Sequence, residues 1–192
     1  MHSDTWRHPR RCARSVWLVA SLLGLSVASA LSAPISREEA LALAFPGAVI
    51  EAERVFLTAE QQTEAAQGAG TAIATGLVAR YVAMQDGRRV GRAYIDTHVI
   101  RTKKESLLVS LDATGAVLRI DVTAFLEPGE YEAPSRWLRQ YDGRVLTDDL
   151  AVERVIRPIA GATLTAHAVN EAVRRVLAID RVLERASGRP GP

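Results

Sequence analysis

Thr163 and Thr165 are the residues of this sequence whose type and spacing best suit chemistry. They follow Gly161 and Ala162 in the stretch "GATLT", where a helical pattern begins. The glycine and alanine leave room for another group to approach the backbone, and a helix start presents free N–H groups and the positive end of the helix dipole. Such a place binds phosphate, and a hydroxyl held beside it could become a phosphoester. Capping is the simpler alternative, because threonine is a common N-cap residue.

The same stretch, followed by a helix that begins "AHAVNEAV", resembles the covalent-flavin motif of the FMN-binding domain family. That family includes the exported flavin subunits of the Rnf and Nqr electron-transport complexes and the periplasmic domain of the nitrous-oxide-reductase regulator. In it, the last threonine of the motif is esterified to the phosphate of FMN. The resemblance implies that Thr165 carries FMN covalently, with Gly161, Ala162, Thr163 and Leu164 forming the turn around it.

Two positions depart from the family pattern, which is Asp, two variable residues, Ser or Thr, then Gly-Ala-Ser/Thr, one variable residue and Thr. Arg157 stands in place of the aspartate, and Ala160 stands in place of the first hydroxyl residue. The family's motif is read by an Mg²⁺-dependent flavin transferase that takes FMN from FAD, so these changes could weaken recognition. Arg157 could instead help to hold the phosphate, since a guanidinium group suits a phosphate well.

The resemblance extends over about half of the chain, from about Val78 to Leu177. It implies an electron-transfer flavoprotein rather than a stand-alone enzyme. The expected partners are the flavin transferase during maturation and a membrane or periplasmic redox protein as electron donor or acceptor. Family members place a residue near the flavin ring on the loop after the last strand, which here offers Glu127, Glu130 and Tyr131.

For several other side chains, the sequence allows either a functional role or a purely structural one. Trp137 could stack on an isoalloxazine ring or anchor its own short helix in the core. His98 could exchange protons with a flavin, although a strand histidine is more often packed or solvated. His167 follows Thr165 within one turn and could face the flavin phosphate. The two lysines, at 103 and 104, are expected at a solvated hairpin tip.

Two rival functions use the same residues differently. In the first, the chain is an exported interaction module without flavin, and "GATLT" only begins a helix. In the second, Thr165 is the nucleophile of a hydrolase. A threonine nucleophile needs an adjacent base, and the sequence offers only the unplaced His98 and His167 for that role.

The first 30 residues have the pattern of a secretory signal peptide. Four arginines precede an uncharged stretch from Ser15 to Leu31, within which Ala28-Ser29-Ala30 has the spacing of a signal-peptidase site. The pattern predicts cleavage after Ala30 and an exported, periplasmic location. An uncleaved membrane anchor is the alternative, although serines and a glycine dilute an apolar run of only 17 residues.

Charge and cysteine content exclude several classes of site and partner. The chain has 24 Lys and Arg against 22 Asp and Glu, and its first 30 residues hold four of the former and one of the latter, so 20 and 21 remain. This balance offers no basic surplus for phosphates, so no nucleic-acid partner is expected. Because the single cysteine, Cys12, lies in the leader, the exported domain has no disulfide or thiolate metal site. Two remaining histidines are too few for a histidine-rich metal site.

The elements that must position these residues form an α+β pattern. Short connections between consecutive strand patterns predict an antiparallel meander, and helices are expected to pack on that sheet. The expected helices are 36–45, 58–70, 135–141 and a long C-terminal helix over 164–186, and the expected strands are 48–57, 76–84, 90–100, 106–111 and 116–125. The predicted organisation is a helix-strand-helix region over 36–75, an FMN-binding domain over 76–186 and a frayed tail over 187–192. Apolar residues of the last strand do not alternate strictly, which indicates a bulge or burial on both sides.

Overall fold

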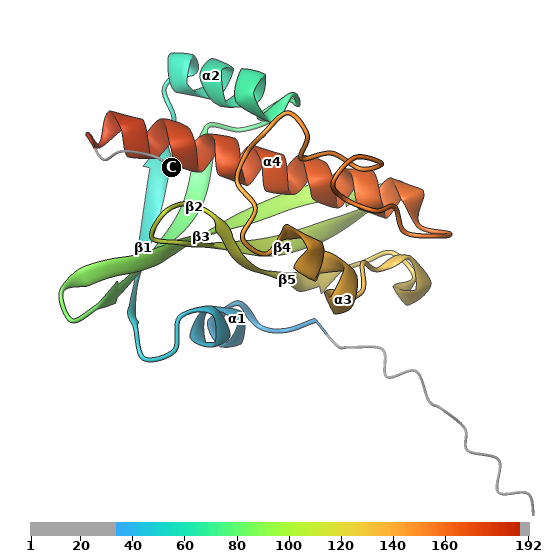
Figure 1. Cartoon of the computed structure of the whole chain (residues 1–192), viewed down its shortest axis with the longest axis horizontal. Coiled ribbons are helices and arrows are strands. Elements are labelled where there is room, and N and C mark those ends of the chain that lie inside the picture. Colours follow the sequence, from blue (N-terminus) through green and yellow to red (C-terminus); the bar gives the residue numbers. More distant parts are fainter. Residues whose placement is uncertain (1–33, 189–192) are drawn as a thin grey trace, which may run out of the picture. The chain divides into compact units, whose positions relative to one another are not determined.

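A computed structural model of the chain describes residues 34–188 (Figure 1). The predicted signal peptide and all but the first two residues of the predicted frayed tail lie outside the described residues. In chain order, the elements are α1 (Arg37–Ala44), β1 (Val49–Phe56), α2 (Ala59–Ala69), β2 (Leu77–Gln85), β3 (Arg88–Ile100), β4 (Lys103–Asp112), β5 (Val117–Phe125), η1 (Gly129–Tyr131), α3 (Ser135–Leu138), η2 (Arg139–Tyr141) and α4 (Thr163–Ala186).

The five strands form one antiparallel sheet in the order β1-β2-β3-β4-β5, which confirms the predicted α+β meander. The turn from β2 to β3 is Asp86-Gly87, and both residues have positive φ, at 50° and 72°. This is the pairing that a tight hairpin turn of the primed type requires. The expected connector over 101–105 is shorter than predicted, because β4 already begins at Lys103 and only two residues form the turn.

Bulges in β5 explain its irregular pattern. The register with β4 shifts twice, leaving Leu118 and Thr123 as extra residues. As a result, Val117, Ile120, Val122 and Phe125 each lie opposite a β4 residue on the same face of the sheet. Of the two explanations that the sequence left open, the structure has the bulge.

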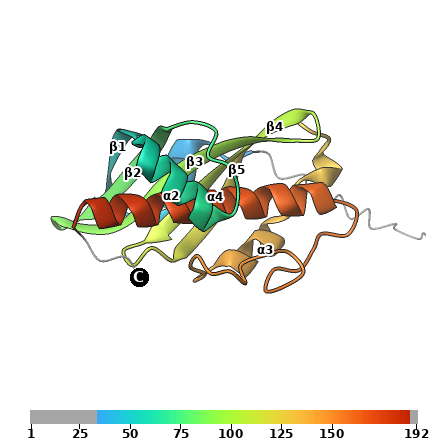
Figure 2. The same cartoon turned by 90° about the horizontal axis from the view of Figure 1, so that it is seen from above.

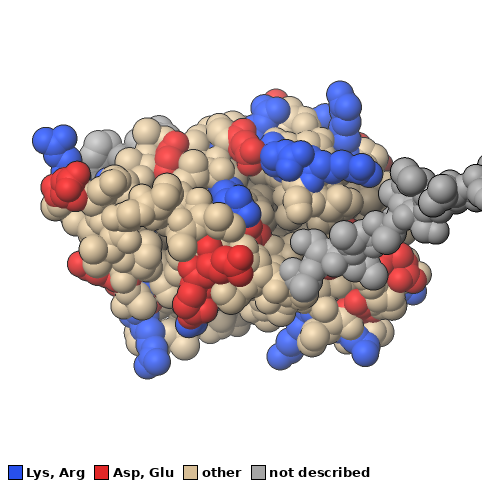
Figure 3. All heavy atoms as spheres, turned by 90° about the horizontal axis from the view of Figure 1, so that it is seen from below, with Lys and Arg blue, Asp and Glu red and all other residues tan. Residues whose placement is uncertain are grey.

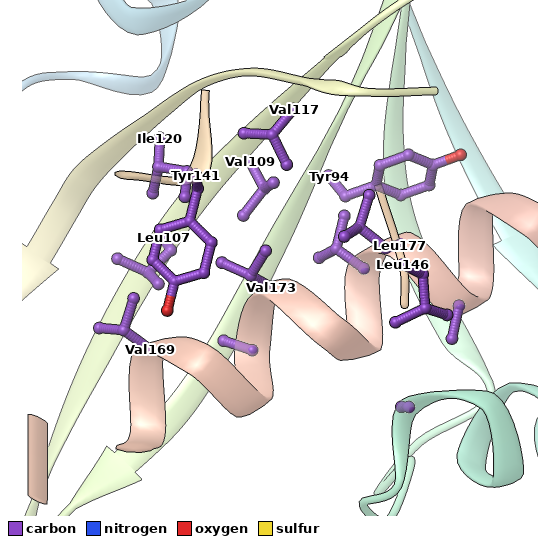
Figure 4. Packing of buried hydrophobic residues seen from close by; sticks show 14 of the residues in the cluster. Tyr94, Leu107, Val109, Val117, Ile120, Tyr141, Leu146, Val169, Val173 and Leu177 are labelled. Atoms are coloured by element: carbon purple, nitrogen blue, oxygen red, sulfur yellow. The ribbon is translucent and has the colours of Figure 1, made fainter. Parts of the chain in front are cut away.

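The long helix α4 crosses one face of the sheet, and α2 packs on its outer side (Figures 1 and 2). Figure 4 shows Val169, Val173 and Leu177 of α4 among the side chains of the main core, together with Tyr94 and Tyr141. Burial of these apolar side chains supplies the main force that holds the helix on the sheet. Helix α4 begins one residue earlier than the sequence predicts, at Thr163.

On the opposite face of the sheet, α1 builds a second, smaller apolar cluster with side chains from β2, β3 and β4. Gly91 allows this contact, because a Cβ atom there would lie 2.3 Å from Cε1 of Phe45 and 2.5 Å from the carbonyl oxygen of Leu111. Figure 3 shows that Lys and Arg side chains on this side are interspersed with Asp and Glu among uncharged surface. None of the helices within residues 34–188 has the length and apolar character needed to cross a bilayer.

The region over 36–75 is an integral part of this fold. Its strand β1 pairs with β2 along all eight residues, and its helix α2 packs against α4. Helix α2 starts with a capping box between Thr58 and Gln61 and ends at Gly70, which has the left-handed conformation. The short helix predicted over 135–141 is one turn of α-helix, α3, followed by the 3-10 turn η2.

Candidate functional site at the start of α4

The N-terminal end of α4 has no side-chain cap. Its N-cap residue is Ala162, and Gly161 before it has a φ of +80° with open space where a Cβ would point. Within residues 34–188, the backbone N–H groups of Thr163, Leu164 and Thr165 donate no hydrogen bond. Capping therefore does not explain the threonines, and the helix start presents three free N–H groups that suit an anion.

The two threonines differ in exposure. Thr163 is the first residue of the helix and is exposed, whereas Thr165 is 1% exposed. The Thr165 hydroxyl donates a hydrogen bond of 2.7 Å to the carbonyl oxygen of Tyr131, in the turn η1. The turn η1 therefore covers the Thr165 hydroxyl, which the sequence predicts as the attachment site. The hydroxyl contacts a carbonyl and not a base, which disfavours the hydrolase.

The loop that carries Tyr131 is fastened to the turn between β3 and β4. The Arg101 guanidinium lies 5.1 Å from the centre of the Tyr131 ring, a cation–π arrangement. Oε1 of Glu127 accepts hydrogen bonds of 2.9 Å from the backbone N–H groups of both Thr102 and Lys103. The hydrogen bonds from the backbone N–H groups of Thr102 and Lys103 lower the pKa of Glu127. Tyr131 thus accepts the hydrogen bond of Thr165 with its backbone carbonyl. The carboxylate of Glu127 binds the turn between β3 and β4 and not Thr165.

The segment that leads into "GATLT" is held by α3 and η2. Nε1 of Trp137 donates to the carbonyl oxygen of Arg157 at 2.6 Å, and Oε1 of Gln140 accepts from the Arg157 N–H at 2.9 Å. The Trp137 ring is 8% exposed and lies edge-on to Tyr141, with ring centres 5.7 Å apart. Trp137 is therefore a core anchor that positions the start of α4. Arg157 and Ala160 are both exposed.

His98 lies in a partly buried ionic cluster under the middle of α4. Its Nδ1 is 2.9 Å from Oδ1 of Asp96, and its Nε2 is 2.9 Å from Oε2 of Glu105. Arg175 of α4 donates two hydrogen bonds to Asp96, at 2.8 and 2.9 Å. Burial lowers the pKa of His98, but the two carboxylates outweigh that effect and raise it to about 9. Burial raises the pKa of Asp96, but the hydrogen bonds and positive charges of Arg175 and His98 outweigh that effect and lower it to about 2.

The C-terminal half of α4 carries a second buried network that the sequence interpretation missed. Arg92 binds Asp180 through two hydrogen bonds, at 2.5 and 2.7 Å, and the Tyr94 hydroxyl donates to the same carboxylate at 2.7 Å. One turn further along, Glu184 accepts from Arg80 at 2.6 Å and from Arg89 at 3.0 Å. The alternation of Arg92, Tyr94, Asp96 and His98 along β3 was the available signal, because residues two apart share one face of a strand.

His167 is exposed one turn into α4. It lines a hollow of about 340 Å³ with Asn170 and Arg174, on the side of the helix that faces α2 rather than η1. Lys103 and Lys104 are exposed at the start of β4, next to the turn that Glu127 binds. The structure thus brings Thr165 together with Tyr131, and it places His98, His167 and Trp137 in other surroundings.

No model of a known protein family matches this chain, and a search of curated proteins finds no relative. The resemblance of "GATLT" to the covalent-flavin motif therefore stays a prediction.

Proposed function

We propose that this chain is an exported flavoprotein that carries FMN on Thr165 through a phosphoester and acts as an electron-transfer relay. The observation that carries the proposal is the uncapped start of α4, where, within residues 34–188, three N–H groups of the first turn have no acceptor and one of them belongs to Thr165 itself. A phosphate group on Oγ1 of Thr165 would lie beside these donors and the positive end of a helix of 24 residues. Bound FMN would supply the exchange of one or two electrons.

The protein's own residues would hold and orient the phosphate. Gly161 leaves space next to the free N–H groups, because, its chain neighbours aside, no atom of residues 34–188 lies within 4 Å of the position of a Cβ there. Arg157 is exposed four residues before it and is the guanidinium nearest in sequence to the motif. Trp137 fixes the backbone of Arg157. Together these features hold the segment that leads into α4 and leave space beside its free N–H groups.

Attachment requires η1 to move. In the structure, the Thr165 hydroxyl is buried and donates to Tyr131, so its oxygen is not free to attack phosphorus. In the proposed reaction, Oγ1 attacks the FMN phosphorus of FAD, the bond from that phosphorus to the AMP oxygen breaks, and the hydroxyl proton is lost as AMP leaves. The hydrogen bond from Thr165 to Tyr131 opposes the movement of the turn by about 1 kcal/mol, and the contacts of Glu127 and Arg101 that fasten the loop oppose it as well.

The test is the intact mass of the protein from cells that contain an active flavin transferase. The wild-type chain should gain the mass of one FMN less one water, and its flavin fluorescence should persist after denaturation. Thr165→Ala should abolish the gain, whereas Thr165→Ser and Thr163→Ala should retain it, the latter at lower yield. An unmodified wild-type chain, or a Thr165→Ala chain that still carries flavin, would refute the proposal.

Two further variants test the role of the surroundings. Arg157→Asp combined with Ala160→Ser restores the family pattern and should raise the yield of attachment, if the transferase reads those positions. Glu127→Ala removes the acceptor that fastens the loop to Thr102 and Lys103. It should increase the initial rate of attachment, because η1 then opens more easily.

An interaction module without flavin is the second candidate. The buried state of the Thr165 hydroxyl favours it, since a hydroxyl bound to Tyr131 has a structural role of its own. In that case the wild-type chain stays at its plain mass in transferase-positive cells, and Thr165→Ala changes only its stability.

A further inference from the structure

Strand β1 is an uncovered edge of the sheet. It pairs with β2 residue for residue, without a bulge, and six of its eight residues are exposed. Every second residue of an edge strand points its N–H and C=O groups away from the sheet. Within residues 34–188, no loop or side chain makes a hydrogen bond to the backbone of β1 on that side. The strand is therefore a straight template for one more strand.

The opposite edge is protected. Strand β5 has two bulges, and its Val117 exchanges backbone hydrogen bonds with residues 143 and 144, at 2.7 and 2.8 Å. The turn η2 and helix α3 also pack against β5. Bulges and a covering segment are the usual means of blocking a sheet edge. Strand β1 uses neither of them.

The side chains of β1 carry a charge pattern that selects a partner. Glu51 and Glu53 lie on the face that α4 covers elsewhere, opposite Val82 and Arg80. Among the described residues, Glu51 has no ion-pair partner, and Glu53 is 43% exposed with Nη1 of Arg80 at 3.6 Å. Two exposed carboxylates two residues apart favour a strand with basic residues at the same spacing.

A hollow of about 540 Å³ lies directly beside these carboxylates. Its lining includes Glu51 and Glu53 together with three arginines, Arg80, Arg88 and Arg89, of which Arg80 and Arg89 bind the carboxylate of Glu184. This volume accommodates the long side chain of a lysine or arginine that reaches across from an added strand. The hollow thus provides space next to Glu51 and Glu53, and the selectivity for a basic residue comes from those two carboxylates alone.

A second copy of the chain is disfavoured at this edge, because every two-fold register that pairs five or more residues of β1 sets like charges against each other. If two copies of β1 paired antiparallel about a two-fold axis, a residue a given number of positions before the axis in one copy would lie opposite the residue the same number of positions after it in the other copy. Centring the axis on residue 51, 52, 53 or 54 then sets Glu51 against Glu51, Glu51 against Glu53, Glu53 against Glu53, or Arg54 against Arg54. Like charges directly opposite each other are destabilising.

We propose that β1 binds an extended segment of another protein, which adds a sixth strand to the sheet and places Lys or Arg side chains opposite Glu51 and Glu53. The uncharged residue between those basic positions lies on the other face, next to the exposed Ala52. Main-chain hydrogen bonds supply the affinity and the two carboxylates supply the selectivity. The proposal does not depend on flavin at Thr165.

The test uses a dye-labelled peptide, Thr-Val-Lys-Val-Lys-Val-Thr, and its counterpart with Glu in place of Lys. Fluorescence anisotropy should show that the exported wild-type protein binds the basic peptide at least about tenfold more tightly than the acidic one. The double variant Glu51→Lys/Glu53→Lys should reverse this preference. The control variant Asp148→Lys/Glu153→Lys makes the same change in net charge at exposed loop positions and should behave as the wild type does.

Hydrogen exchange locates the bound peptide. The basic peptide should slow exchange of amides in β1 and leave those of β5 unchanged. Equal binding by the wild type and the Glu51→Lys/Glu53→Lys variant would overturn the proposal, as would binding without protection of β1. A dimer in sedimentation whose β1 amides are protected without any peptide would overturn it in favour of a second copy.

Discussion

The two ends of α4 are held on the sheet by different forces. At the C-terminal end, Asp180 and Glu184 are about 2% exposed and bind arginines of β2 and β3. At the N-terminal end there is no side-chain cap, and Thr165 contributes one neutral hydrogen bond. A charged group buried in a network costs several kcal/mol to unpair, whereas a neutral hydrogen bond contributes about 1 kcal/mol.

Because of this difference, the C-terminal end of α4 is held firmly on the sheet, whereas its N-terminal end opens more easily. Local opening starts where the fewest buried interactions must break, so it should start at the turn η1 and the first turn of α4. The end that lacks buried ion pairs among residues 34–188 is also the end with free N–H groups. The ionic end keeps the helix in place while the other end changes its contacts.

Asp180→Ala should give the largest loss of stability. The substitution leaves the Arg92 guanidinium, 1% exposed, without its carboxylate and removes the acceptor of the Tyr94 hydroxyl. Breaking a buried pair from one side costs about 3–5 kcal/mol, which chemical denaturation would measure. Glu171→Ala, at an exposed position of the same helix, is the control and should change stability by less than about 1 kcal/mol. A loss as small as that for Asp180→Ala would remove the contrast between the two ends.

The His98 cluster should make stability depend on pH. The folded pKa of about 9 lies above the ordinary value of 6.5, so the contribution of His98 is complete below pH 6.5 and is lost as pH rises to about 9. The shift corresponds to about 3 kcal/mol at most. Asp96, with its pKa lowered from 3.8 to about 2, adds stability above pH 3.8 that is lost as pH falls towards 2. Denaturation midpoints across this range would show the decline, and His98→Gln should flatten the part between pH 6.5 and 9.

Much of the fold could be predicted because local signals agree with it. Turn residues such as Asp86 and Gly87 marked the hairpins, and alternation marked the strands. The bulges in β5 could only be suspected, since which residue is extra depends on how β4 pairs with β5. The connector before β4 was predicted too long because Lys103 and Lys104 suggested a loop, whereas backbone pairing with β3 continues through both.

The position of the candidate site could be predicted from the sequence, but the burial of its threonines could not. "GATLT" does begin a helix, as predicted. Which of Thr163 and Thr165 is buried depends on η1, which lies 34 residues from Thr165 in the chain. The ionic networks were equally hidden, since Arg92 and Asp180 are 88 residues apart. Pairing of distant charges is decided by packing and leaves no local pattern.

Trp137→Phe should have an intermediate effect that concentrates on the N-terminal end of α4. It keeps most of the ring but removes the N–H group that binds the Arg157 carbonyl oxygen. The expected loss is about 1–2 kcal/mol, and hydrogen exchange should quicken over residues 157–165 while the amides around Asp180 stay protected. Uniform quickening along the whole helix would show that the two ends open together.

Thr165→Val should have the smallest effect on stability. Valine keeps the shape of threonine but cannot donate to the Tyr131 carbonyl oxygen, so the expected loss is about 0.5–1 kcal/mol. Exchange should quicken in η1, and Thr165→Ser, which keeps the donor, should protect the turn better. A loss close to that of Asp180→Ala would mean that the hydroxyl holds the N-terminal end as firmly as the ion pairs hold the other. The turn η1 could then not withdraw at low cost, and attachment of a flavin phosphate to Thr165 would lose its physical basis.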